Sequence, residues 1–200
     1  MMRHIAPICA MTWLIGCATA PPDATTIPIE DAKHQNHLAK LTHIEHFDLK
    51  GRLSIHTQKQ GFSATIIWQH QLSTDNIAVF SPFGSKVAEI QKNIQEVIFT
   101  DAQGKSIRAQ DTGILTEQAM GWRLPLSGLS DWILGKPTQG KIDQMLWDVD
   151  GKLTRLKQQG WDIEYLNYQK VDDYQLPSKI FMRSDQLNLK LLIEQWGALE

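Results

Sequence analysis

The sequence predicts a mainly β domain built from antiparallel strands, with helices in two parts of the chain. Two observations predict this class. Apolar and polar residues alternate in short runs that recur at intervals of about ten residues, with turn signals between them. In two segments this alternation gives way to helical spacing or is lost. The pattern is typical of an antiparallel meander, a sandwich or a barrel, with no internal repeat and no domain boundary.

The elements follow in order along the chain. Leu38, Leu41 and Ile44 recur at helical spacing and predict one amphipathic helix over residues 31–47. Strands are then expected at residues 49–56, 62–70, 77–80, 87–90, 96–100 and 105–109. The stretches 116–120 and 127–134 lack alternation and are predicted to be helical. Strands resume at residues 144–149, 152–158, 161–168, 179–183 and 187–195, and Asp150-Gly151 predicts a tight hairpin between the first two.

The first residues have the pattern of an exported lipoprotein. Arg3 supplies a short positive region, and residues 5–15 are mostly apolar but shorter than the ~20 residues that span a membrane. Leu14-Ile15-Gly16-Cys17 resembles the bacterial lipobox, in which the chain is cut before the Cys and the Cys is acylated. The alternative is an ordinary secretory signal with an incidental Cys. Lipidation is favoured because Cys9 would leave with the signal, so that Cys17 could form no disulfide.

These patterns divide the chain into three parts. Residues 1–16 are expected to be a lipoprotein signal peptide, residues 17–30 a lipidated flexible tether rich in Ala, Thr and Pro, and residues 31–200 a single domain. Ala18 occupies the position where, in enteric-type bacteria, an Asp tends to retain lipoproteins in the inner membrane, so it favours the outer membrane. The formal net charge of −2 and the absence of a basic face argue against nucleic acid as a partner.

No motif predicts an enzyme, a metal site or a cofactor. His34 with His37, and His43 with His46, are spaced i, i+3 on the first predicted helix, but HExxH and a supporting Cys or carboxylate set are absent. A solvated helix face is the expected role of these histidines. Gly104-Lys105-Ser106 ends like a P-loop but lacks the glycine that opens that motif, and no G-x-S-x-G occurs. Catalytic residues dispersed along the chain would leave no such signal.

The stretch Ser81-Pro82-Phe83-Gly84-Ser85 combines turn chemistry with a large aromatic side chain. A hairpin tip normally carries small or polar residues, so Phe83 either folds back into the core or stands exposed. The turn alone favours the core. The strands are rich in bulky apolar residues, which could fill a barrel or line a hollow that holds an apolar ligand. Patterning alone favours the filled interior.

Several short motifs are specific only in combination. The longest is LSDWILGKP at residues 129–137. The others are the lipobox with Cys17, Gly51-Arg52, Ile66-Ile67-Trp68-Gln69, the Ser81-Pro82-Phe83-Gly84-Ser85 turn, Gly121-Trp122 and Leu124-Pro125-Leu126. Together they resemble the LolB family, and the resemblance covers nearly all of the chain after the tether.

The resemblance implies a fold and a function. The implied fold is an unclosed antiparallel β-barrel of about eleven strands, with an N-terminal helix and with short helices that plug an apolar cavity. The implied protein is anchored in the outer membrane, faces the periplasm, accepts lipoproteins from the soluble carrier LolA and inserts them into the outer membrane. Its implied partners are LolA with its lipoprotein cargo, the acyl chains of that cargo and outer-membrane lipid, and a monomer is expected.

The resemblance also implies site residues. Pro82, Phe83 and Gly84 match a membrane-insertion loop, so Phe83 is expected to be exposed; the family commonly has Leu there, which differs in shape but not in character. Alternation and helical spacing suggest an acyl-chain cavity lined by Ala64, Ile66, Trp68, Ala88, Ile90, Leu129, Trp132 and Ile133. The alternatives are a lipoprotein that binds another apolar molecule, a structural envelope factor, and a soluble LolA-type carrier, which Cys17 and the Phe83 turn disfavour.

Overall fold

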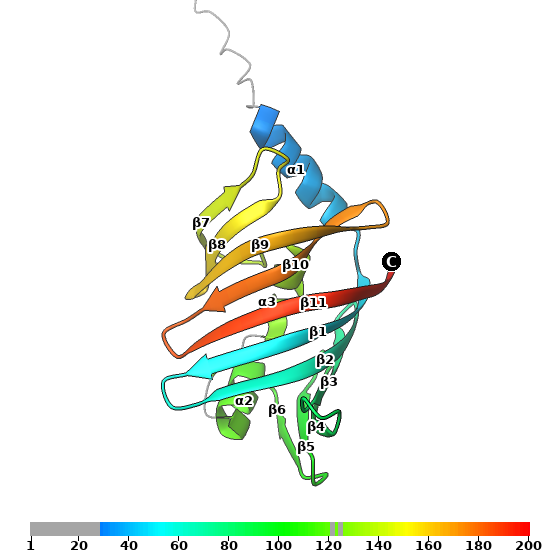
Figure 1. Cartoon of the computed structure of the whole chain (residues 1–200), viewed down its shortest axis with the longest axis vertical. Coiled ribbons are helices and arrows are strands. Elements are labelled where there is room, and N and C mark those ends of the chain that lie inside the picture. Colours follow the sequence, from blue (N-terminus) through cyan, green and yellow to red (C-terminus); the bar gives the residue numbers. More distant parts are fainter. Residues whose placement is uncertain (1–28, 121–122, 124–125) are drawn as a thin grey trace, which may run out of the picture.

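The computed structural model describes residues 29–120, 123 and 126–200 (Figure 1). The predictions for residues 1–28, including the signal peptide and Cys17, lie outside the described residues, as do Gly121-Trp122 and Leu124-Pro125. The elements in chain order are α1 (Ile29–Leu41), β1 (His46–Thr57), β2 (Gly61–Gln71), β3 (Thr74–Phe80), β4 (Lys86–Lys92), β5 (Val97–Asp101), β6 (Ser106–Ala109), α2 (Thr112–Met120), α3 (Leu126–Leu134), β7 (Ile142–Trp147), β8 (Leu153–Gln158), β9 (Trp161–Val171), β10 (Tyr174–Arg183) and β11 (Leu187–Leu199).

All of these strands belong to one antiparallel sheet, in the order β6-β5-β4-β3-β2-β1-β11-β10-β9-β8-β7. The last strand, β11, pairs with the first, β1, and so joins the six-strand meander before α2 to the five-strand meander after α3. The two edges, β6 and β7, do not pair with each other, and the sheet curls around α2 and α3 without closing (Figure 1). This confirms the predicted mainly β class and the unclosed barrel.

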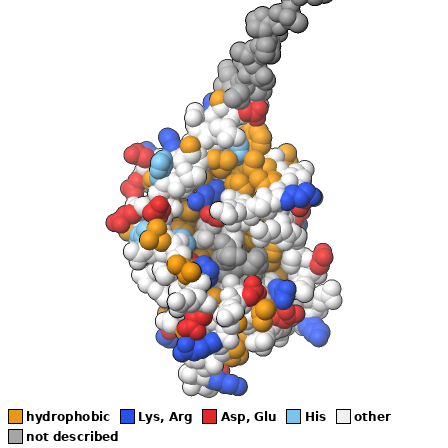
Figure 2. Space-filling model, turned by 180° about the vertical axis from the view of Figure 1, so that it is seen from behind, with side chains coloured by type: hydrophobic (Ala, Val, Ile, Leu, Met, Phe, Trp, Pro, Cys, Tyr) orange, Lys and Arg blue, Asp and Glu red, His pale blue; other side chains and the backbone are white. Residues whose placement is uncertain are grey.

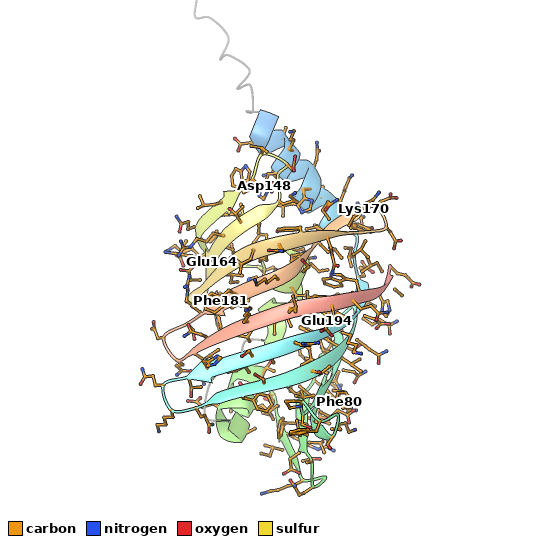
Figure 3. The ribbon with its side chains drawn as sticks, in the orientation of Figure 1. Phe80, Asp148, Glu164, Lys170, Phe181 and Glu194 are labelled. Atoms are coloured by element: carbon orange, nitrogen blue, oxygen red, sulfur yellow. The ribbon has the colours of Figure 1, made fainter. Side chains whose placement is uncertain are left out.

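Alternation fixes which side chains face inward. Along β2, Ala64, Ile66 and Trp68 are buried, whereas Ile67 between them is 41% exposed. The outward face carries ion pairs, among them Arg52 with Glu194 and Arg183 with Glu164; Figure 3 shows Glu164, Phe181 and Glu194 on β9, β10 and β11. The sheet is therefore polar outside and apolar inside, as a one-sided antiparallel sheet should be.

The interior of the five-strand meander is filled. Side chains of β8, β9 and β10 pack there with no exposed surface, among them Leu156, Ile163 and Ile180. Helix α3 is fixed against them by two hydrogen bonds. The Trp132 indole Nε1 donates to Gln158 Oε1 at 3.0 Å, and the Tyr165 hydroxyl donates to the Trp132 carbonyl at 2.9 Å. This half is the close-packed part of the body.

Helix α1 docks on the turn between β7 and β8. His34 is fully buried, its Nδ1 lies 2.8 Å from the Gly151 carbonyl oxygen, and its ring stacks on Trp147 at 4.2 Å. Lys33 Nζ donates to the Val149 carbonyl at 2.9 Å. The expected solvated face for the helix histidines is therefore wrong for His34. In the view from behind, hydrophobic side chains gather in the upper part of the body, at the end of the molecule that carries α1 (Figure 2).

The first helix ends earlier than predicted. It stops at Leu41, and Ile44 is buried in the connection that follows. Phe47 lies in β1, where its ring packs between Trp68, His70 and Trp196 with centroid distances of 4.9–5.6 Å. Apolar residues three apart suit a helix, but a strand buries Phe47 and Leu49 equally well, and the pairing of β1 with two neighbours decides the outcome.

Candidate functional site: an apolar cavity and an exposed aromatic turn

A cavity of about 470 Å³ lies mainly against the inner face of the six-strand meander. Its wall comes from β1–β5, β10 and β11, and α2 and α3 close one side. The lining residues are Leu53, Ile55, Thr57, Gln60, Gly61, Phe62, Ile66, Trp68, Ile77, Val79, Val87, Ala88, Ile90, Phe99, Ala119, Leu129, Ile133, Met182, Leu189 and Leu191. Nearly all of them are apolar. Of the two interiors that the sequence allowed, this part of the body has the hollow one, and the five-strand meander has the filled one.

The structure brings most of the predicted lining residues to this cavity. Ile66, Trp68, Ala88, Ile90, Leu129 and Ile133 all line it. Ala64 and Trp132 are buried but do not line the cavity. The side chain of Trp132 turns away from it, toward Gln158 on β8 and Trp161 on β9. The cavity is also lined by Met182, Leu189 and Leu191, which were not predicted to do so. Their alternation was visible, but their proximity to β1 depends on the pairing of the last strand with the first.

The lining side chains form rows across the sheet. Trp68, Ile77, Ile90 and Phe99 are direct neighbours on β2, β3, β4 and β5, and Ile66, Val79 and Ala88 form the next row toward the β1–β2 turn. On the other side of the Trp68 row, the corresponding row is polar and consists of His70, Asp75 and Lys92. None of these three lines the cavity, so the cavity ends at the Trp68 row.

The polar row is an ion cluster built on one buried carboxylate. Asp75, 1% exposed, accepts hydrogen bonds from Trp68 Nε1 at 2.9 Å and from Lys92 Nζ at 2.7 Å, and its Oδ1 lies 2.7 Å from His70 Nδ1. Burial raises the pKa of Asp75, but the bonds to His70 and Lys92 outweigh burial and hold the pKa below its ordinary value. An ionised Asp75 therefore fixes the Trp68 indole at the end of the cavity.

The Ser81-Pro82-Phe83-Gly84-Ser85 turn presents its aromatic ring to solvent. Phe83 is 96% exposed, so the structure has it outside the core. The turn is closed by hydrogen bonds from Ser81 N to Ser85 O at 2.8 Å and from Gly84 N to Ser81 O at 2.9 Å. Gly84 has a φ of 86°, a conformation in which a side chain is strained. Figure 3 marks Phe80 on β3, where the turn begins.

Connectivity puts this turn and the open end of the cavity at the same end of the sheet. In an antiparallel meander alternate turns lie at the same end of the sheet, so the β3–β4 turn with Phe83 shares its end with the β1–β2 turn. The lining residues Gln60, Gly61 and Phe62 at that turn are exposed, whereas Trp68 at the other end is 1% exposed. The cavity therefore opens toward the end that carries Phe83.

None of the described helices is long and apolar enough to cross a membrane. Among the described residues, no group of three or more His, Cys, Asp or Glu is arranged to hold a metal ion.

Comparison with known proteins then decides the family. The family model described as "Outer membrane lipoprotein LolB" matches residues 45–196. The chain belongs to the LolB family. Two relatives named "Outer-membrane lipoprotein LolB" are similar over nearly their whole length. That of Nitrosomonas europaea is 31% identical over 188 residues, 92% of this chain and 87% of the relative, and that of Thiobacillus denitrificans is 32% identical over 198 residues, 98% of each.

Solved structures support the fold alone. A LolA superfamily protein from Nitrosomonas europaea aligns with a TM-score of 0.54 at 10% identity, over 84% of this chain and 94% of that chain. A DUF1329 family protein from Desulfovibrio piger aligns with a TM-score of 0.53 at 9% identity, over 85% and 92%. The LolB resemblance in the sequence is thus confirmed, and the names of the relatives support a role as an outer-membrane lipoprotein.

Proposed function

We propose that this chain is a lipid-anchored receptor that faces the periplasm, accepts lipoproteins from the carrier LolA into its cavity and inserts them into the outer membrane. The function is that of a binding and transfer protein and not of an enzyme. The observation that carries the proposal is the pairing of an apolar cavity with an exposed aromatic turn at its open end.

The cavity supplies the driving force in this proposal. An acyl chain gains ~0.8 kcal/mol for each CH₂ that leaves water, so a 16-carbon chain gains ~12 kcal/mol. A lipoprotein therefore needs an apolar surface to shield its chains on the way to the membrane. Transfer from carrier to receptor needs no nucleotide if this cavity binds the chains more favourably than the carrier does, and release into the bilayer then runs downhill.

The turn supplies orientation. A fully buried Phe side chain contributes ~1.5–3 kcal/mol, too little to hold the protein on a membrane alone. With acylated Cys17 as the lasting anchor, Phe83 would enter the bilayer interface and turn the mouth of the cavity toward lipid. Pro82 and Gly84 would set the shape of the turn, since Gly84 holds a positive φ.

The test compares Phe83→Glu with Ile94→Glu. Ile94 is 85% exposed on the β4–β5 turn, which lies at the opposite end of the meander, so it is a matched control for an exposed apolar residue. With LolA–lipoprotein complex and phospholipid vesicles, Phe83→Glu should accept cargo but fail to insert it, and Ile94→Glu should do both. Insertion that is equal in the two variants would refute the role of Phe83.

Two further measurements separate this function from its rivals. A radiolabelled fatty acid supplied to growing cells should label the chain at Cys17 and should not label Cys17→Ala, whereas a soluble carrier would stay unlabelled in both. Depletion in the source bacterium should leave newly made lipoproteins in the periplasm in complex with carrier. If they reach the outer membrane normally, the chain binds some other apolar molecule.

A further inference from the structure

We infer that the cavity takes one acyl chain of about 16 carbons at a time, and that Trp68 is the floor that sets this length. The inference rests on the proposed function, since it describes how the same cavity measures its ligand. It follows from the length of the cavity, its volume and the support of its closed end.

The length of the cavity is given by β2, whose lining residues run from its first residue, Gly61, to Trp68. Phe62 stands at the mouth, Trp68 is the last lining residue of the strand, and the six steps between them span about 20 Å at ~3.3 Å per residue. An extended hydrocarbon chain with C–C bonds of ~1.5 Å advances ~1.25 Å per carbon. A chain that runs along β2 therefore reaches Trp68 after roughly 16 carbons.

The volume gives an independent estimate. At the density of protein interiors a methylene occupies ~27 Å³, so the cavity of about 470 Å³ holds roughly 17 methylenes. This agrees with the length and leaves no room for a second chain of similar size. The remaining chains of a diacylated or triacylated cargo must therefore lie outside the cavity while the first is inside.

The closed end is firm enough to act as a stop. Trp68 is held by its hydrogen bond to Asp75, which is itself fixed by His70 and Lys92. Phe47 packs on the Trp68 ring at 5.5 Å and on the His70 ring at 4.9 Å. A longer chain would have to displace Trp68 and contact the buried charged groups of His70, Asp75 and Lys92. An apolar chain offers these groups no hydrogen bonds, so this contact is unfavourable.

The experiment measures binding of lysophosphatidylcholines with saturated chains of 10–20 carbons to the purified chain carrying Cys17→Ala, so that its own anchor cannot compete. Affinity should rise about fourfold per methylene and stop rising near 16 carbons, with one molecule bound per protein. Trp68→Ala removes ~140 Å³ of side chain and should move the plateau to longer chains by about five carbons. Trp161→Ala is the matched control, because Trp161 is also buried, does not line the cavity and should leave the plateau in place.

A second variant keeps the test decisive if Trp68→Ala does not fold. Ala88 lines the cavity in the row next to that of Trp68, on the side of the mouth. Ala88→Leu should shorten the preferred chain by about three carbons. Affinity that keeps rising to 20 carbons, two molecules per protein, or a plateau unmoved by both variants would overturn the inference and leave the proposed function standing. Failure of every chain length to bind would instead overturn the proposed function.

Discussion

Replacement of Asp75 by Asn tests the buried cluster that supports the cavity. The change keeps the shape of the side chain but removes its charge, and it places an amide in a site where Oδ1 and Oδ2 together accept from Trp68 and Lys92 and contact His70. Lys92, whose side chain is 16% exposed, would lose its counter-charge without gaining much water. The cluster behaves as a buried ion pair and not as a surface one.

The expected cost follows from that burial. Breaking a buried pair from one side costs ~3–5 kcal/mol, and the partial exposure of Lys92 favours the lower end, near 3 kcal/mol. For a body of this size such a loss lowers Tm by roughly 6–12 °C. The double variant Asp75→Asn/Lys92→Met should recover part of the loss, because it removes the stranded ammonium group as well.

The assay is urea unfolding followed by circular dichroism, at several pH values. The pKa of Asp75 is lower in the folded chain than in the unfolded one, so its contribution is complete above the ordinary carboxyl pKa of ~4 and is lost as pH falls through the folded pKa. The parent should therefore lose more stability in acid than Asp75→Asn does. A loss below ~0.5 kcal/mol at neutral pH would show that the cluster is no stronger than a surface pair and would refute the reasoning.

Two further predictions concern the junction of the meanders and helix α1. A Cβ on Gly51 would lie 2.6 Å from the Leu192 carbonyl oxygen on β11, so Gly51→Ala should destabilise by ~1–3 kcal/mol in the same urea assay, whereas Gly104→Ala, with nothing within 4 Å and only a positive φ to strain it, should cost less. Burial lowers the pKa of His37, with His34 nearby as a second cause, so protonation favours release of α1. The stability that neutral His37 confers is present above its ordinary pKa of ~6.5 and is lost as pH falls through the folded pKa. The protection factors of the α1 amides, which are exchange rates corrected for the intrinsic effect of pH, should thus fall on acidification in the parent and fall less in His37→Gln; an equal fall in both would contradict this role.

Much of the fold was predictable because the strands are one-sided. Once Ile66 and Trp68 were assigned to the inward face of β2, the same alternation put Ala88 and Ile90 on the inward face of β4, and the structure agrees. The helix with Leu129 and Ile133 could be directed inward for the same reason, since an amphipathic helix beside a curled sheet has one place to bury its apolar stripe. These inferences needed only local periodicity.

The parts that failed depend on distant pairing. Asp75 follows Ser73 and Thr74, which read as a loop, and nothing local indicates a buried carboxylate. It becomes the centre of a cluster only because β3 brings it between His70 and Lys92. Trp132 was expected in the cavity, yet a stripe on a short helix is broad, and the partner that turns the indole away, Gln158, lies 26 residues further on.

The two halves of the body have complementary energetic roles. At ~24 cal/mol per Å³, the value for voids in a filled core, a cavity of about 470 Å³ would cost up to ~11 kcal/mol, less where its mouth admits water. That is comparable to the entire stability of an ordinary domain, ~5–15 kcal/mol. The filled half around Leu156, Ile163 and Ile180, together with the Asp75 cluster, must therefore hold the hollow half open. A 16-carbon chain that enters returns ~12 kcal/mol by leaving water, a gain of the same size. Acceptance of a chain should then be favourable without any rearrangement of the sheet.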